Sequence, residues 1–358
     1  MTRKFIKKKQ KARDDGNLEQ WAHYCRELGE LYRNSGKYQD ALFQYKEEER
    51  VNGSLGNPVA VAISNRMIGE IYCDLGEYEE ALKYQKKHLD IAKMENVDIE
   101  VQRALANIGR TYFCKAESLT SRQPEYNSSL ACAKNAYLKS LKVCENLKGI
   151  GLLVQMEMKT RLLMNLGLVL ECQDDMSKAV DYIEQAIQIA KKHELWEDLC
   201  RCYSAIGMLY QRSGNHTRAL RSLNLALEVA ERLDSRVKTS CEILLSKAEV
   251  LFLIADFGGA RQALLKAYKL KTPNVRDRAT IEKNLRIEKA GEEGQKLCPI
   301  YVSLSQTYKD DGQYDLALEY AKKELKLWLD VPQELSILEN FVAPFSLIFS
   351  SNQYLIPI

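Results

Sequence analysis

The four histidines are the side chains best suited to proton transfer or metal binding at neutral pH. They are His23, His88, His193 and His216, and they fall in different segments with no shared spacing. Cys200 and Cys202 are two residues apart, so on a helix they point to different faces, and no partner lies at a metal-ligand interval. The sequence also lacks a phosphate-binding loop, a dinucleotide fingerprint and a nucleophile elbow. We therefore expect no enzyme activity, no metal site and no cofactor.

The composition narrows the function classes further. Of 358 residues, 46% are hydrophobic and 28% charged, and 52 Lys and Arg against 49 Asp and Glu give a net charge of +3. That charge is too small to predict nucleic-acid binding by the chain as a whole, and we expect no direct sequence-specific contact with nucleic acid. The ten cysteines form no C-x-x-C pair and follow no signal sequence, which favours a reducing intracellular compartment. The apolar run at 341–349 is interrupted by Pro344 and too short for a membrane span.

One local exception to the charge balance is the basic run RKFIKKKQKAR at 3–13. Such a run is compatible with a nuclear localisation signal or a phosphate contact, although basic residues also commonly cap helices.

A frame of small and aromatic residues repeats along the chain, most plainly in LGELYRNSGKYQDAL (28–42) and IGEIYCDLGEYEEAL (68–82). Its first glycine recurs at Gly29, Gly69, Gly109, Gly167 and Gly207, with spacings of 40, 40, 58 and 40. Three residues later stand Tyr32, Tyr72, Tyr112, Leu170 and Tyr210. A second glycine follows at Gly36, Gly76 and Gly214. An alanine follows at Ala41, Ala81, Ala179, Ala219, Ala260 and Ala317.

These small residues have a physical meaning. A glycine kept at one phase of a helix costs about 1 kcal/mol relative to alanine, so it is expected where two helices approach closely. The second glycine lies between two helical periods, where a left-handed residue ends one helix and lets the next turn back. Each unit is thus a pair of helices that must stack on its neighbours to bury its apolar face. The sequence predicts an all-α fold, an α-α superhelix with a period of about 40.

The predicted organisation has five parts: a basic segment at 1–17, six helix pairs over 18–272, a linker or extra helix at 273–296, a seventh pair at 297–330, and an atypical tail at 331–358. In the third pair, KAESLTSRQPEYNSS (115–129) contains Pro124 and is expected to form a loop. The tail has no repeat phase, and we expect it to be poorly ordered and to come from a truncated or alternatively ended product.

The order of glycine, tyrosine and alanine resembles the tetratricopeptide repeat, whose usual period is 34 residues. In that family the first helices of the pairs line a groove that binds peptides. The resemblance assigns groove positions to seven arginines: Arg26, Arg66, Arg103, Arg110, Arg161, Arg201 and Arg212. Arginine binds carboxylates through a planar fork of N–H groups, so we expect partners with acidic segments, bound across the third to fifth repeats.

An alternative reading remains open for some of these arginines. Arg26 and Arg66 are followed four residues later by Glu30 and Glu70, and such pairs commonly decorate an exposed helix without further purpose. Of the other five, the four at positions 103, 110, 161 and 201 have no acidic residue four positions further on. They are the stronger candidates for peptide binding.

The chain resembles the N-terminal repeat region of the Tonsoku-like protein family over about residues 5–330. The resemblance is carried by short segments within the repeats: LGELY, IGEIY, ALANIGRTY, TRLLMNLGLVLE and ARQALLKAYKL. The resemblance implies a nuclear scaffold at chromatin and replication forks that acts in recombination repair. It also implies a large helical partner, histones, histone chaperones and replisome components. The ankyrin and leucine-rich repeats of that family are not in this sequence, so no histone-reading residue carries over. The alternatives are a G-protein signalling modulator-like protein or another cytosolic peptide-binding adaptor.

Overall fold

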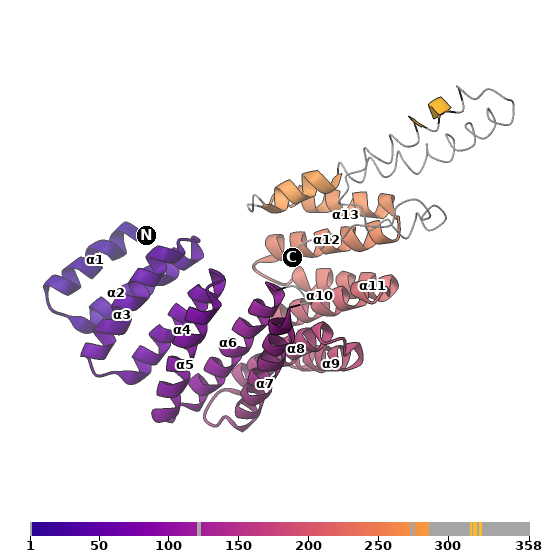
Figure 1. Ribbon diagram of the computed structural model, residues 1–358. Helices are drawn as coiled ribbons and strands as arrows, with labels where there is room; N and C mark the ends of the chain where they lie inside the picture. The colour runs from indigo at the N-terminus through magenta and orange to yellow at the C-terminus, as the bar shows by residue number, and fades with distance from the viewer. Residues whose placement is uncertain are drawn as a thin grey trace. The chain divides into compact units, whose positions relative to one another are not determined.

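The computed structural model describes residues 2–119, 123–272, 274, 276–285, 316, 318–320 and 322–323, and these residues contain helices and no strand. The chain divides into two compact units, Met1–Ala205 and Ile206–Ile358. In the first unit, each helix packs on the next along the chain from α1 to α9 (Figure 1). The predicted all-α tetratricopeptide-type solenoid is confirmed.

The 40-residue period arises from helix length. The helices α2 (Leu18–Asn34), α3 (Tyr38–Ser54), α4 (Pro58–Asp74) and α5 (Tyr78–Met94) each have 17 residues. Three-residue turns separate them, so two helices and two turns fill each period. The additional residues of the 40-residue period therefore lie in the helices, and the connections stay short.

The turns use the left-handed conformation that the sequence predicted at the second glycine. Gly36, Gly76 and Gly214 have φ of 72°, 80° and 74°. The N–H of Lys37, just after the first of these, donates to the carbonyl of Tyr32 at 2.9 Å, which closes the end of α2. Asn57 then begins the next pair by accepting from the N–H of Ala60 at 3.0 Å, because a short polar side chain satisfies a free amide at a helix start.

The first glycine of each frame lies where two helices of a pair touch. A Cβ added at Gly29 would lie 2.7 Å from the ring of Tyr45, and one at Gly69 would lie 2.8 Å from Cγ of Gln85. The frame alanines of the described residues are fully buried on the second helices: Ala41, Ala81, Ala179, Ala219 and Ala260. The sixth, Ala317, lies outside the described residues. Small residues on both helices therefore set the close spacing of each pair.

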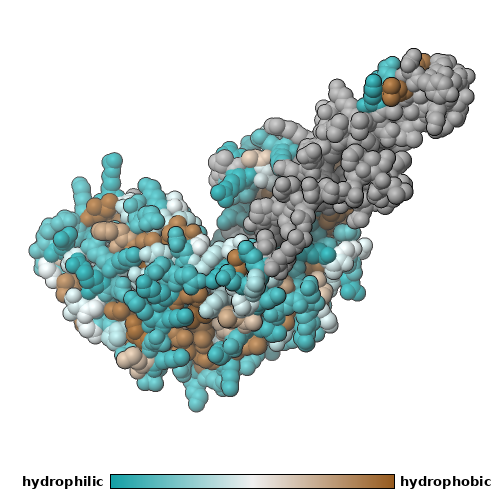
Figure 2. All heavy atoms as spheres, viewed as in Figure 1, coloured by the Kyte–Doolittle hydropathy of each residue, from teal (hydrophilic) through white to brown (hydrophobic). Residues whose placement is uncertain are grey.

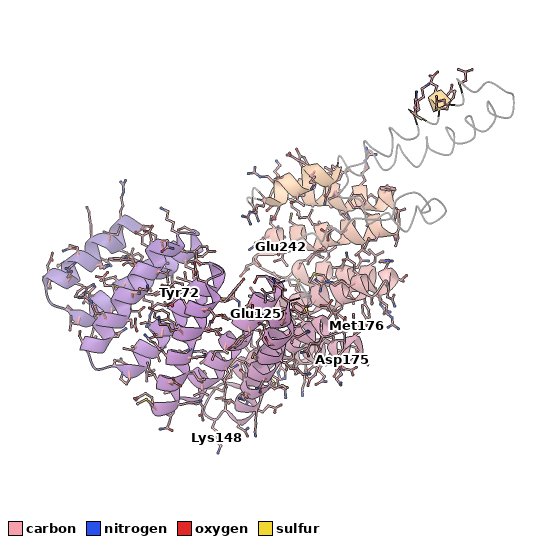
Figure 3. All side chains as sticks on the ribbon, viewed as in Figure 1. Tyr72, Glu125, Lys148, Asp175, Met176 and Glu242 are labelled. Carbon is pink, nitrogen blue, oxygen red and sulfur yellow. The ribbon has the colours of Figure 1, made fainter. Side chains whose placement is uncertain are left out.

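Aromatic residues fill the space between pairs. Tyr72, labelled in Figure 3, stacks on Tyr84 with ring centroids 5.6 Å apart. Lys46 Nζ donates to the hydroxyl of Tyr72 at 2.8 Å. The tyrosine of the frame thus joins a helix of one pair, α3, to both helices of the next.

The third pair differs from the prediction. Its helices α6 (Asp98–Glu117) and α7 (Pro124–Asn146) extend into the segment expected to be a loop. Pro124 begins α7 and does not lie in the loop, because the first helical position needs no N–H donor and the fixed φ of proline suits it. The inserted residues therefore lengthen both helices. The ring of Tyr137 lies against Gly109, and Ala133, one turn earlier on α7, is fully buried in the same cluster, although the frame did not indicate this alanine.

The basic segment at the start of the chain forms α1 (Thr2–Asp14), which packs on α2. Trp21 of α2 anchors it: the guanidinium carbons of Arg13 and Arg50 lie 5.4 and 5.6 Å from the centroid of the indole ring, and Nε1 donates to Glu47 at 3.0 Å. Lys9 also pairs with Glu47. Thus α1 is an additional helix of the stack.

The remaining helices are α8 (Leu152–Cys172), α9 (Met176–Lys192), α10 (Trp196–Arg212), α11 (His216–Ala230), α12 (Arg236–Leu253) and α13 (Phe257–Lys269). Within the second unit, α12 packs on α11 and α13. Residues 276–285 are also helical, and Ile281 is buried against α12 and α13.

The seventh pair predicted at 297–330 lies almost wholly outside the described residues, and the tail at 331–358 lies entirely outside them. Among the helices that are described, none carries an apolar stretch long enough to cross a bilayer.

Candidate protein-interaction face

The first helices of the pairs are α2, α4, α6, α8 and α10, and we call the surface that they share the first-helix face. Helices α4 and α6 contact each other directly, as do α6 and α8. In the first unit, the visible side chains are mostly hydrophilic, with smaller hydrophobic areas between them (Figure 2). Charged side chains on consecutive first helices can therefore reach one another.

A network of ion pairs joins α2, α4 and α6. Arg33 on α2 places Nη1 2.7 Å from Glu70 Oε2 and Nη2 3.4 Å from Asp74 Oδ2, both on α4. Arg110 on α6 donates to the other oxygen of Asp74 at 2.8 Å. Asn107 donates from Nδ2 to Glu70 at 3.0 Å. Glu70 and Asp74 thus link three consecutive pairs.

Glu100 is the centre of a second cluster, and its side chain is only 4% exposed. His88 Nε2 on α5 donates to it at 2.9 Å, Arg103 Nη1 lies 2.5 Å from its other oxygen, and Arg66 Nε on α4 lies 3.7 Å away. Burial by itself would raise the pKa of Glu100, but the hydrogen bond from His88 and the charges of Arg66 and Arg103 lower it to about 2. The carboxylate is thus held ionised between three helices.

A third cluster joins α8 to the start of α10. Arg161 donates from Nε to Asp198 at 2.8 Å and also pairs with Glu157 on its own helix. Asp198 is 5% exposed, and Arg201 Nη1 lies 3.7 Å from it. Burial would lower the pKa of Arg161, but Asp198 and Glu157 raise it, so the guanidinium stays charged.

Arg26 pairs with Glu48 on α3 at 2.5 Å, and not with Glu30 four residues along its own helix. Glu48 is almost fully buried, and burial raises its pKa despite the charge of Arg26. Arg66 lies 3.9 Å from Glu70, so the expected pair within α4 does form.

The structure changes the reading of the arginines at 103, 110, 161 and 201. The absence of an acidic residue four positions ahead did not mean that these arginines lack an acidic partner. Arg161 and Arg201 pair with the residues four positions before them, Glu157 and Glu197. Arg110 pairs with another helix altogether. Arg212 lies in the last turn of α10, in the second unit, and also has a partner.

Several residues of these clusters were missed by sequence reasoning. Glu100 and Asp198 each stand three residues before an arginine of the predicted set, Arg103 and Arg201, and nine residues before a motif glycine. That shared phase is the signal that would have indicated them. Asn107 carried no such signal.

The described residues contain no group of three or more His, Cys, Asp or Glu that could hold a metal ion. The charged clusters consist of arginines paired with carboxylates within the chain, and these ion pairs join neighbouring repeats.

Comparison with known proteins supports this family of folds. Residues 66–96, 159–232 and 299–327 each match the family described as tetratricopeptide repeat. The chain is 37% identical to the Tonsoku-like protein of Drosophila melanogaster, over 93% of this chain and 28% of that protein. It is 33% identical to the Tonsoku-like protein of Mus musculus, over 91% of this chain and 24% of that protein. The chain therefore spans about a quarter of the length of these relatives.

Solved structures share the fold at low identity. A signal transduction ATPase with a tetratricopeptide repeat sensor from Pyrococcus horikoshii matches with a TM-score of 0.58 and 14% identity, over 92% of this chain and 45% of that one. Aspartyl phosphate phosphatase F from Bacillus subtilis matches with a TM-score of 0.57 and 13% identity, over 89% and 73% of the two chains. These likenesses concern the fold alone.

Proposed function

The chain belongs by sequence with the tetratricopeptide-repeat region of the Tonsoku-like protein family, and from this premise we propose that it is a non-enzymatic scaffold in replication-fork maintenance and homologous-recombination repair. Its place of action is the nucleus, at chromatin. By resemblance its partners are a large helical repair protein, histones, histone chaperones and replisome components. The similarity to Tonsoku-like proteins over nearly the whole chain is the observation that carries this proposal.

Partners with acidic segments bind, in this proposal, to the first-helix face through its arginines. The side chains of Arg103, Arg161 and Arg201 are 39%, 43% and 56% exposed, whereas Glu100 and Asp198 beneath them are 4% and 5% exposed. In the pairs with Glu100 and Asp198, the arginine thus reaches solvent and the carboxylate is buried. A guanidinium has five N–H donors, and each of these arginines uses only one or a few of them within the chain. The remaining donors are available to a carboxylate of a partner.

The ion-pair clusters give different arginines different structural roles. Arg110 and Arg161 connect neighbouring first helices, so their replacement would also weaken the stack. Arg103 pairs within its own helix, and Glu100 keeps Arg66 and His88 if Arg103 is removed. If Arg201 is removed, Asp198 similarly keeps its ion pair with Arg161. Arg103 and Arg201 are therefore the residues at which binding can be tested without disturbing the fold.

We expect the double substitution R103Q/R201Q to weaken binding of a fluorescein-labelled glutamate-rich peptide about tenfold, which corresponds to about 1.4 kcal/mol for two lost charge-assisted contacts. Fluorescence anisotropy measures the affinity. Thermal unfolding monitored by circular dichroism should show only a small decrease in the midpoint, because Glu100 keeps Arg66 and His88 and Asp198 keeps Arg161. The matched control is K83Q/K178Q, which removes the same charge from exposed side chains on the second helices α5 and α9. It should leave peptide affinity within twofold, as is usual for surface sites. Unchanged affinity in R103Q/R201Q would refute acidic recognition by this face.

Affinity purification from replicating cells, with and without fork-stalling drugs, tests the biological role. We expect replisome and chromatin proteins to be recovered with the wild-type chain and to be depleted with R103Q/R201Q. Recovery of G-protein subunits or chaperones instead would overturn the assignment. The peptide experiment is independent of this one, so a wrong partner class and a wrong binding face give different results.

A further inference from the structure

The outer face of α1 is the largest local excess of positive charge that the described helices do not neutralise. Between Thr2 and Asp14 there are seven basic residues and one acidic residue. Lys9 pairs with Glu47, Arg13 lies over Trp21, and Lys8 Nζ lies 5.5 Å from the ring centroid of Tyr24. Five basic residues are exposed and have no carboxylate within ion-pair distance among the residues that the structure describes: Arg3, Lys4, Lys7, Lys8 and Lys11.

Four of these lysines occupy one stripe of the helix. Lys4, Lys7, Lys8 and Lys11 have the spacing i, i+3, i+4 and i+7, which places them on one face. Ala12 is the buried residue of α1, and it lies about a quarter of a turn from that stripe, toward α2. At 1.5 Å per residue, the stripe is roughly 10 Å long. It therefore forms a continuous basic surface, which we call the α1 lysine face.

This arrangement is unfavourable for the helix itself. Lys4 with Lys8 and Lys7 with Lys11 are like charges four residues apart, each of which destabilises a helix by a few tenths of a kcal/mol. The first turn of α1 contains no acidic residue, although the helix dipole favours negative charge there. Elsewhere in the first unit, basic residues such as Arg33 and Lys115 pair with carboxylates on other helices. Apart from the contact of Lys8 with Tyr24, helix stability and packing therefore do not account for the α1 lysine face.

We propose that the α1 lysine face binds the sugar-phosphate backbone of nucleic acid without reading its sequence. Lysine presents a compact charge on a flexible stem, which suits phosphates whose spacing varies, whereas the arginines of the first-helix face suit planar carboxylates. Duplex DNA carries one charge per roughly 1.7 Å of its axis, so a 10 Å stripe faces several phosphates. The surface provides positive charge with no base-reading group, and this inference does not depend on the function proposed above.

The test compares K4Q/K7Q/K8Q/K11Q with the wild-type chain, using fluorescence anisotropy of labelled duplex DNA, labelled single-stranded DNA and the glutamate-rich peptide. Glutamine has nearly the helix propensity of lysine, so α1 should remain folded. We expect affinity for the DNA probes to fall about a hundredfold at low salt, and the slope of log K against log salt concentration to become shallower by roughly 3. The two DNA probes identify which strand form is bound.

The matched control is K83Q/K86Q/K87Q/K93Q on α5, which removes the same charge from another exposed helix. It should keep the wild-type DNA affinity and salt slope. An equal loss in both variants would overturn the proposal, because it would reflect net charge alone. Loss of peptide binding with intact DNA binding in the α1 variant would also overturn it, in favour of an acidic protein partner. A salt slope in the α1 variant equal to that of the wild-type chain would also overturn the proposal, because it would show that these lysines contact no phosphates.

Discussion

Replacing Gly167 with valine is expected to lower the free energy of unfolding by about 3 kcal/mol, because it overfills the contact between α8 and α9. A Cβ at this position would lie 2.5 Å from Cγ1 of Ile183 and 2.9 Å from the carbonyl oxygen of Ala179. Ile183 is fully buried and the carbonyl belongs to the backbone of α9, so neither can move aside without separating the helices. Chemical denaturation followed by circular dichroism measures the change.

Gly53 provides the matched control. It lies in α3, and nothing would come within 4 Å of an added Cβ. Replacing it with alanine should stabilise the chain by roughly 0.5 kcal/mol, since alanine loses less backbone entropy on folding. If G167V unfolded at the same denaturant concentration as the wild type, the frame glycine would not set the distance between the helices, and the physical reading of the repeat would be wrong.

The repeat frame could be read from the sequence because its causes are local or recur at one interval. Gly36 ends a helix through its own backbone conformation. Gly29 meets the residue 16 positions later, Tyr45, because the helices of the first two pairs have equal lengths. The loop predicted at 115–129 was drawn too long for the opposite reason. A proline can lie in a loop or begin a helix, and the insertion had no neighbouring repeat of equal length from which to place the helix ends.

The ion pairs could not be read from the sequence in the same way. Arg33 pairs with Glu70, and Arg161 with Asp198, each across 37 positions. These pairings depend on which first helices are adjacent and on how each is rotated about its axis. The helical wheel of a single helix does not give this information. The sequence located the arginines on the first helices, but their partners follow from the stacking. Whether those arginines also bind peptide stays a prediction.

Glu100 shows how much one such cluster contributes to stability. Its pKa in the folded chain is lowered to about 2 from an ordinary value of 4.5, so its stabilising effect is fully present above about pH 4.5 and is lost as the pH falls toward 2. A shift of this size corresponds to roughly 3 kcal/mol at neutral pH. The contribution should fall to about half of that near pH 3.

We therefore expect E100Q to lower the free energy of unfolding by roughly 3 kcal/mol near pH 7 and by about half as much near pH 3, since glutamine resembles the protonated acid. The control E79Q removes a carboxylate whose side chain is 78% exposed and pairs with Lys115, so its effect should stay below about 0.5 kcal/mol. Urea unfolding of the three proteins at both pH values measures these differences. A cost for E100Q that did not shrink in acid would mean that packing of the side chain, and not its charge between His88, Arg66 and Arg103, holds α4, α5 and α6 together.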